Sequence, residues 1–180
     1  PAITQFGEVR DTLPEDWDLI YRTNLLSPLQ WTLHFYETMI GAGAGKIVLI
    51  SSLAAYAGYP TATAYATMKA GLLGLFRSIR HEGAARQIDF YLALPGYVST
   101  NIYKTALFRN TSYEKTMELI RSLGFRVLSA DDAARRILKS VRSGRREFAF
   151  PQYASLMKWL APRMPWLISL VHQRIVGNFR

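Results

Sequence analysis

Two predominantly apolar runs, each preceded by a long helical pattern, constrain the fold of this chain most. The runs are KIVLISS (46–52) and QIDFYLALP (87–95). Strands of a parallel sheet that helices cover on both faces have nearly continuous apolar sequences, so we expect both strands to be buried on both sides. Apolar residues at helical spacing precede them over 11–40 and 61–81. This alternation predicts an α/β domain with a parallel sheet and right-handed crossovers.

Local signals set the ends of these elements. Pro14 suits the first turn of a helix, and the glycines of GAGAG (41–45) should end it. Ser27 and Pro28 should disturb the helix locally, because a proline removes a hydrogen bond and crowds the preceding turn. Three later elements are expected: a helix over SYEKTMELIRSL (112–123), a helix capped by SADD (129–132) and reaching about Val141, and a third strand at REFAFP (146–151). The chain then divides into an α/β part, 1–150, and a tail, 151–180, of one or two amphipathic helices broken at prolines.

Composition excludes several classes of protein and site. The 180 residues are enough for one domain with its own core. Without cysteine, structural disulfides and thiolate metal sites are excluded. The formal charge is +9, but the basic residues are scattered apart from RSGRRE (142–147) and the tail. A nucleic-acid site would need them on one face with interleaved aromatics, so we expect no nucleic-acid partner and favour a solvated basic face or attraction to anionic phosphate or membrane.

Other familiar site patterns do not fit. In GAGAGK (41–46) a P-loop fails because Ile47 follows the lysine and the loop precedes the strand, and a dinucleotide fingerprint fails because Lys46 replaces its third glycine. The three histidines, His34, His81 and His172, lack ligand-like spacing, so we expect surface or core histidines and no metal site. A Gly-x-Ser-x-Gly nucleophile motif does not occur.

YATMK (65–69) places Tyr65 and Lys69 one helical turn apart, and Ser52 ends the first apolar run. Reduction of a carbonyl by hydride transfer builds negative charge on oxygen, which needs a proton donor and a hydrogen bond there. The reference pKa of tyrosine, about 10, is too high for efficient exchange at neutral pH. We expect the Lys69 cation to lower the pKa of Tyr65. Ser52, at the carboxyl end of a parallel strand, can hold the carbonyl oxygen.

The order Asn24, Ser52, Tyr65-x-x-x-Lys69 and PGYVST (95–100), with these gaps, resembles the short-chain dehydrogenase/reductase family over about 1–150. The block from Lys46 to Ala84 is similar to that family's central region almost throughout. The resemblance implies a Rossmann-like, doubly wound parallel sheet. It also implies an NAD- or NADP-dependent oxidoreductase that interconverts a carbonyl and an alcohol.

The resemblance also implies catalytic roles for individual residues. Tyr65 would be the general acid/base, Lys69 would also bind the nicotinamide ribose, Ser52 would hold the substrate oxygen, and Asn24 would hold a water in the proton relay. Blander interpretations stay open: Asn24 as a helix irregularity, Ser52 as a strand-end cap, and Tyr65 with Lys69 as a structural pair.

The Pro-Gly segment carries the implied cofactor contacts, which Tyr65 and Lys69 would share. Pro95 and Gly96 would let the chain pass close to the nicotinamide. Val98 would offer its backbone N–H to the carboxamide, and Thr100 would contact the same end of the cofactor. Pro95 and Gly96 could instead serve only to end the strand.

The first part of the family pattern is not in this sequence. It comprises a Thr-Gly-x-x-x-Gly-x-Gly turn and an Asn-Asn-Ala-Gly strand, so the chain resembles the C-terminal two-thirds of such an enzyme. We therefore expect an incomplete sheet of about three strands whose first strand has an unpaired edge. NAD and NADP are not distinguished, because the residue that selects between them lies in the earlier part. The alternative is a non-catalytic remnant that acts as an interaction or structural module.

The segment after the Pro-Gly motif and the tail bear on substrate and location. The segment after the Pro-Gly motif carries apolar and aromatic residues, namely Tyr97, Tyr103, Leu107, Phe108, Tyr113 and Leu119. A cavity lined by such residues suits a hydrophobic carbonyl or alcohol, such as a lipid or steroid-like molecule. The same residues would serve equally well to pack a lid onto the core. The tail combines tryptophans, leucines and basic residues, as interfacial helices do, and a lid or a dimer contact would show the same pattern. Without a signal peptide or a membrane span, we expect a cytoplasmic homo-oligomer, with peripheral membrane contact through the tail as an alternative.

We predict that the isolated chain of 180 residues binds nicotinamide cofactor weakly or not at all. Without the glycine turn, the pyrophosphate lacks the backbone N–H groups and the helix dipole that hold it. Titration calorimetry with NAD and NADP measures this directly, and tight binding would contradict the prediction.

Overall fold

Three parallel strands form the central sheet of the protein, for which a computed structural model describes residues 2–179. The strands are β2 (Gly45–Ile50), β3 (Ile88–Pro95) and β7 (Glu147–Phe150), in the order β2-β3-β7. Gly45 lies opposite Ile88, and Leu92 lies opposite Glu147. The three predicted strands and their parallel direction are confirmed.

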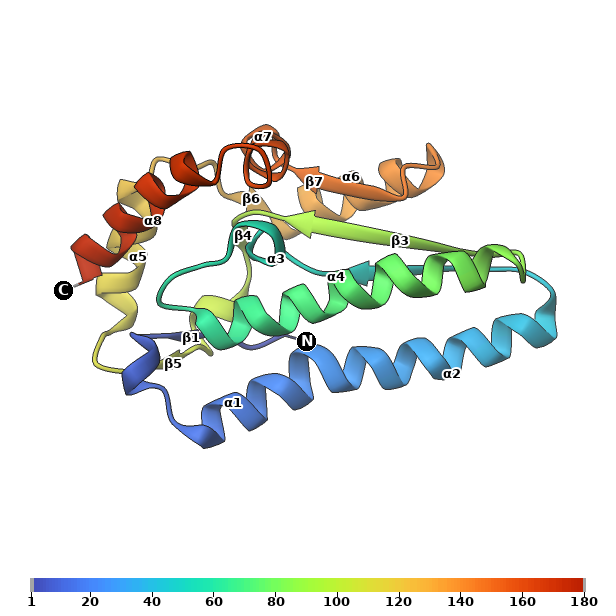
Figure 1. Cartoon of the computed structure of the whole chain (residues 1–180), viewed down its shortest axis with the longest axis horizontal. Coiled ribbons are helices and arrows are strands. Elements are labelled where there is room, and N and C mark those ends of the chain that lie inside the picture. The colour runs from blue at the N-terminus through green and yellow to red at the C-terminus, as the bar shows by residue number, and fades with distance from the viewer. Residues whose placement is uncertain (1, 180) are drawn as a thin grey trace.

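Helices cover both faces of this sheet, as the α/β expectation requires (Figure 1). α2 (Ser27–Ala42) and α4 (Thr63–Ala84) lie on one side, and α6 (Ala130–Arg142) lies on the other. Successive side chains of β3 point to opposite faces. Phe90, Leu92 and Leu94 therefore join the cluster with α4, while Tyr91 and Ala93 join the cluster with α6. Every residue from Ile88 to Leu94 except Asp89 is buried.

β2 is buried less completely than predicted. Ile47 and Leu49 are buried against α2 and α4, and on the opposite face Val48 is only partly buried and Ile50 is exposed. Among the described residues β2 pairs with β3 alone, which leaves the row of backbone groups on its other edge without a strand neighbour. The expectation of burial on both faces is therefore wrong for β2, and the expected unpaired edge is confirmed.

The first long helix is interrupted near the predicted place. α1 (Pro14–Tyr21) continues into a π-helical turn, Arg22–Leu26, and then into α2. Pro28 has no N–H to donate, and its ring crowds the carbonyl four residues earlier, that of Asn24. A wider turn at this point relieves that crowding, and such π-helical turns are common at functional sites. The helix ends where Gly43 adopts φ 79°, as the glycine run predicted.

The remaining elements are short pieces around the carboxyl edge of the sheet. Ser112 and Ser129 accept hydrogen bonds at the starts of α5 and α6. The cap at Ser129 was predicted from the sequence and is confirmed, and the cap at Ser112 was not predicted. The two short strand pairs are parallel. These pieces are β1 (Gln5–Phe6) paired with β5 (Leu107–Phe108), β4 (Val98–Ser99) paired with β6 (Leu128–Ser129), 3-10 turns at Val9–Asp11 and Asn101–Tyr103, α3 (Ala54–Ala57) and α5 (Tyr113–Ser122).

The tail forms α7 (Gln152–Leu160) and α8 (Pro165–Phe179), with the break at the prolines as predicted. In Figure 1, α7 follows β7 at the top of the view, and α8 descends beside α5. No helix among residues 2–179 is both long and apolar enough to cross a membrane.

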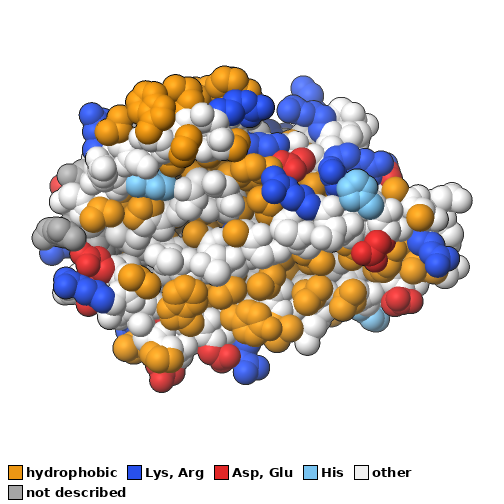
Figure 2. Space-filling model, in the orientation of Figure 1, with side chains coloured by type: hydrophobic (Ala, Val, Ile, Leu, Met, Phe, Trp, Pro, Cys, Tyr) orange, Lys and Arg blue, Asp and Glu red, His pale blue; other side chains and the backbone are white. Residues whose placement is uncertain are grey.

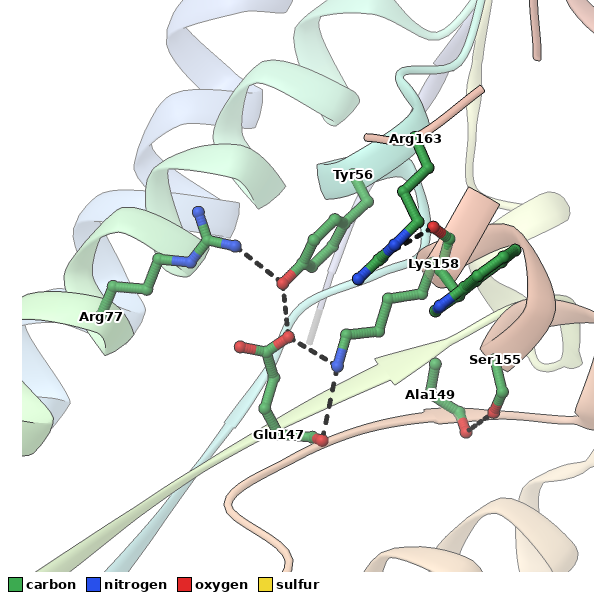
Figure 3. A network of polar contacts seen from close by, with 8 residues as sticks. Tyr56, Arg77, Glu147, Ala149, Ser155, Lys158 and Arg163 are labelled. Carbon is green, nitrogen blue, oxygen red and sulfur yellow. Dashed lines mark hydrogen bonds and ion pairs between the residues drawn. The ribbon is translucent and has the colours of Figure 1, made fainter. Parts of the chain in front are cut away.

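A polar network fixes α7 to the rest of the molecule (Figure 3). The Glu147 carboxylate of β7 accepts a hydrogen bond from the Tyr56 hydroxyl of α3 and forms an ion pair with Lys158 of α7 at 2.7 Å. Arg77 of α4 donates to the Tyr56 hydroxyl at 2.8 Å and stacks on its ring. Burial raises the pKa of Glu147, but the hydrogen bonds from Lys158 and Tyr56 outweigh it, so this pKa lies below its ordinary value of 4.5.

We predict that Glu147→Gln destabilises the protein at neutral pH by roughly 1–3 kcal/mol, because Lys158 loses its partner while largely covered. The pKa of Glu147 is lower in the folded state than in the unfolded one, so its stabilisation is present above pH 4.5 and is lost as the pH falls through the folded pKa. Urea unfolding should therefore show the difference from wild type shrinking in acid. Glu118→Gln, at an exposed position of α5, is the matched control and should change little. A difference that stays constant, or grows on acidification, would contradict this account.

Candidate active site

One cavity of about 690 Å³ opens where β2 and β3 end, a size typical of small-molecule sites. Seven of the eight residues predicted from the sequence line it: Ser52, Tyr65, Lys69, Pro95, Gly96, Val98 and Thr100. The eighth, Asn24, is not among the lining residues. The carboxyl edge of a parallel sheet is where α/β proteins bind ligands, and the tertiary structure brings these distant segments together there.

Tyr65, Ser52 and Lys69 converge within this cavity. Tyr65 and Lys69 lie one turn apart on α4, and Ser52 follows β2. The Tyr65 phenol has a side-chain hydrogen bond with Ser52. The Lys69 Nζ lies 5.6 Å from the centroid of the Tyr65 ring and donates to the backbone oxygen of Ile50 at 3.0 Å. A proton donor, a hydroxyl partner and a cation therefore share one wall.

Burial dominates the electrostatics of this group. It raises the pKa of Tyr65, and the hydrogen bond with Ser52 opposes the rise without overcoming it. Lys69 is 5% exposed, and burial lowers its pKa to about 8. The prediction that Lys69 lowers the pKa of Tyr65 is wrong for this structure, because removal from water disfavours the phenolate and the ammonium alike. The site holds a neutral phenol that keeps its proton until charge develops on a bound oxygen.

Contacts from neighbouring segments position α4 at the site. Ser51 donates its hydroxyl proton to the backbone oxygen of Lys69 at 2.8 Å. Gln5, fully buried on β1, faces the amino end of α4. With its amide oxygen turned toward the helix, it accepts hydrogen bonds at 3.0 Å from the N–H groups of Thr63 and Ala64, which the helix itself leaves unpaired. Sequence reasoning missed Gln5, because its sixty-residue distance from Tyr65 in the chain gives no signal.

Asn24 lies in the π-helical turn and is almost fully buried. Its amide oxygen accepts from the Ile3 N–H at 3.0 Å, and its amide nitrogen donates to the Ile3 oxygen at 2.6 Å. The side chain therefore fixes the segment before β1 onto the helix. Its role in holding a water stays a prediction, and its place in an irregular turn agrees with the alternative drawn from the sequence.

Gly96 has a packing role that the sequence did not reveal. A Cβ at this position would lie 2.2 Å from the Tyr153 hydroxyl of α7, so a larger residue here would displace the Tyr153 ring. That hydroxyl accepts a hydrogen bond from the Tyr97 N–H at 2.7 Å. Close approach of α7 thus explains Gly96 independently of any cofactor contact. The nearby Thr100 hydroxyl caps the following 3-10 turn by accepting from the Ile102 N–H.

Aromatic side chains form another wall of the cavity. The Tyr59 and Tyr97 hydroxyls are 2.9 Å apart, and burial raises the pKa of both. The Phe125 ring stacks between Tyr97 and Tyr153, with centroid distances of 6.0 and 4.6 Å. Tyr59, Phe125 and Tyr153 were missed, because each comes from a different element.

The predicted substrate segment divides into two groups. Tyr97 and Tyr103 line the cavity, as a substrate wall would. Four residues pack elsewhere, as the lid alternative allowed. Phe108 stacks on Phe6 at 6.0 Å and contacts Tyr113, Leu107 packs near Ile20, and Leu119 is buried in α5.

The tail helices complete the enclosure of the cavity. Met157 of α7 and Val171, His172 and Ile175 of α8 line it. Burial lowers the pKa of His172, which favours its neutral form. His172 was expected to be a surface or core residue, and it is a lining residue instead. Of the interpretations left open for the tail, the lid agrees with this placement.

Comparison with known proteins identifies relatives of the chain. The family model for short chain dehydrogenases matches residues 2–109. The human protein named dehydrogenase/reductase SDR family member 4 is 31% identical over 122 residues, which cover 66% of this chain and 44% of that protein. Acetoacetyl-CoA reductase of Cupriavidus necator is 36% identical over 103 residues, covering 57% of this chain and 42% of the reductase. The matched part is thus less than half the length of these relatives.

Solved structures show the same architecture. A short-chain dehydrogenase from Streptomyces avermitilis superimposes with a TM-score of 0.76 at 19% identity, covering 96% of this chain and 65% of that one. A gluconate 5-dehydrogenase from Burkholderia cenocepacia, in complex with NADP and tartrate, gives a TM-score of 0.56 at 26% identity, covering 58% and 41%. The first likeness confirms the Rossmann-like fold of the later strands and helices. With the family match over more than half of its length, the chain belongs to the short chain dehydrogenase family.

Proposed function

We propose that the protein carrying this chain is an NAD- or NADP-dependent oxidoreductase that interconverts a carbonyl and an alcohol by hydride transfer. The observation that carries the proposal is the convergence of Ser52, Tyr65 and Lys69 at the carboxyl edge of the sheet. The family match supports it, and the Burkholderia relative was solved with NADP bound. A non-catalytic remnant is not favoured, because such a module would not need these three polar groups around one cavity.

The residues present fit the nicotinamide end of such a cofactor. Glycine at position 96 and the backbone of residues 95–98 border a cavity large enough for a nicotinamide together with a small substrate. Lys69, Val98 and Thr100 would hold that end of the cofactor. When bound, the nicotinamide supplies or accepts the hydride.

Ser52 and Tyr65 act on the substrate oxygen in this mechanism. The Ser52 hydroxyl donates a hydrogen bond to that oxygen and orients it. Tyr65 transfers its phenolic proton to the oxygen as negative charge develops there, and it recovers a proton when the alcohol is oxidised. The raised pKa of Tyr65 keeps the phenol protonated beforehand. The Lys69 ammonium, adjacent to the ring, then offsets the charge of the phenolate that remains.

The cavity walls favour a hydrophobic substrate. Tyr59, Tyr97, Phe125 and Tyr153 form a continuous aromatic surface, and Met157 and Ile175 add apolar contacts from the tail. Aromatic faces recognise flat or branched apolar groups through area and shape. The name of one relative includes acetoacetyl-CoA, and that of another includes gluconate, so the relatives do not indicate one substrate class. The inference of a hydrophobic substrate therefore rests on the residues that line the cavity.

We also propose that the protein forms a homo-oligomer in the cytoplasm. Large apolar side chains are exposed along α1 and α2, including Leu19, Trp31 and Phe35. Figure 2 shows hydrophobic side chains gathered along the lower edge of the molecule, where these helices run in Figure 1. A patch of this kind marks an interaction surface.

In the full-length protein, Tyr65→Phe should lower kcat by roughly 10²–10⁴-fold, since it removes the proton donor. The affinity for the cofactor should stay nearly unchanged, because the ring and Lys69 remain. Turnover is followed by the absorbance of the reduced nicotinamide, and cofactor binding by calorimetry. Tyr36→Phe is the matched control, because that ring packs on Phe90 away from the cavity. Wild-type kcat in Tyr65→Phe would disprove the catalytic assignment.

Phe125→Ala should raise KM for bulky apolar substrates by about tenfold, because the stack between Tyr97 and Tyr153 loses its middle ring. The same variant should change KM for a small aliphatic ketone by much less. Steady-state kinetics with a series of ketones of increasing size tests this. Equal effects on small and bulky substrates would argue against an aromatic substrate wall.

A further inference from the structure

The tail helices present a second apolar surface, directed away from the cavity. On α7 and the residues after it, Leu156, Trp159 and Arg163 recur at intervals of three and four residues, and on α8 Trp166, Leu170 and Arg174 recur at intervals of four. Residues at these spacings share one face of a helix. The two tryptophans and two leucines are each more than half exposed, and both arginines are exposed. α7 with the turn that follows it therefore carries an outward stripe of one Trp, one Leu and one Arg, and so does α8.

The inner faces of the same helices are already occupied. Ala154 and Ile168 are buried, and Met157, Val171 and Ile175 line the cavity. A surface helix normally turns one apolar stripe to the core and a polar face to water. Packing within the protein therefore accounts for one face of α7 and α8 and leaves the outward stripes unexplained.

The charged residues of the tail itself have one sign. Residues 151–180 contain Lys158, Arg163, Arg174 and Arg180 and no aspartate or glutamate. Lys158 is paired with Glu147, the nearest preceding acid. The Arg163 guanidinium lies 4.9 Å from the Trp159 ring and donates to the Trp159 oxygen at 3.0 Å, so it is held at the apolar stripe. In Figure 2, hydrophobic side chains flanked by basic ones gather along the upper edge, where α7 lies in Figure 1.

We propose that the outward face of α7 and α8, defined by Leu156, Trp159, Arg163, Trp166, Leu170 and Arg174, docks on an anionic membrane surface without crossing it. Tryptophan and leucine enter the boundary between headgroups and acyl chains, and arginine pairs with anionic headgroups. A second copy of this face is a poorer occupant. A symmetric contact would bring basic stripes against each other, and the tail has no carboxylate to balance them.

Docking would place the walls of the cavity beside the bilayer. Met157 and Trp159 lie on the same helix, as do Ile175 and Arg174, so one surface of each helix faces lipid and the other faces the cavity. A hydrophobic substrate dissolved in the membrane would then reach the cavity without crossing much water. This consequence rests on the proposed oxidoreductase function, whereas the docking itself does not.

Flotation of the full-length protein with lipid vesicles tests the docking without cofactor or turnover. The protein should float with vesicles that contain both phosphatidylcholine and phosphatidylglycerol. A smaller fraction should float with vesicles of phosphatidylcholine alone, and high salt should reduce the fraction that floats with the mixed vesicles. Leu170→Glu should weaken binding to the mixed vesicles about tenfold or more. Leu138→Glu is the matched control, because Leu138 is an equally exposed leucine on a basic helix, α6. Arg163→Gln with Arg174→Gln should weaken binding by roughly fivefold for each charge removed.

Circular dichroism and urea unfolding check that each variant is folded. Failure of the wild-type protein to float with the mixed vesicles would overturn the proposal, as would equal loss in Leu170→Glu and Leu138→Glu. The proposal also fails if vesicles are not bound and Trp166→Glu instead dissociates an oligomer in sedimentation experiments, which would assign the face to a second copy. Loss of turnover in Tyr65→Phe with unchanged flotation would separate the two proposals.

Discussion

Burial of β3 on both faces is the constraint on which the site depends. Phe90, Leu92 and Leu94 pack against α2 and α4, while Tyr91 and Ala93 pack toward α6. This sandwich fixes the carboxyl end of β3 against that of β2, with Ser51 N–H donating to the Ala93 oxygen at 2.9 Å. Ser52 follows the end of β2, and Pro95 and Gly96 lie at the end of β3, so these residues are neighbours. The packing that forms the core therefore also fixes the position of the candidate active site.

The catalytic group shows how a protein core and a polar site coexist. Lys69 is a buried cation whose Nζ donates a hydrogen bond to the Ile50 oxygen, and its backbone oxygen accepts one from the Ser51 hydroxyl. Burial without partners would be far more unfavourable. The lowered pKa of Lys69 and the raised pKa of Tyr65 are both consequences of this dry setting. Both shifts favour the neutral forms, and Tyr65 gives up its proton when the substrate oxygen becomes the stronger base during reaction.

The tail connects the site to the outer surface of the molecule. Through Lys158 it joins the Tyr56–Glu147–Arg77 network (Figure 3). Through Tyr153 it packs on Gly96 beside the cavity. The position of α7 is thus fixed at two points, one polar and one steric. The helix that carries the exposed Trp159 is therefore held against the cavity wall, and a partner bound to its outer face would lie close to the site.

The sequence by itself determined the elements and their order, because apolar periodicity, caps and glycines act over a few residues. It also identified eight candidate site residues, seven of which line the cavity, since the motif spacing specifies which strand end or helix turn carries each one. Only the tertiary structure decided that Asn24 binds Ile3, that Gln5 caps α4, and that Phe125 stacks between Tyr97 and Tyr153. These contacts join segments far apart in the chain, so no local pattern predicts them. The direction of the pKa shift at Tyr65 also depends on the tertiary structure. The four-residue spacing in the sequence predicts a lysine charge near the phenol, but it does not predict that the phenol is removed from water, and that removal raises the pKa.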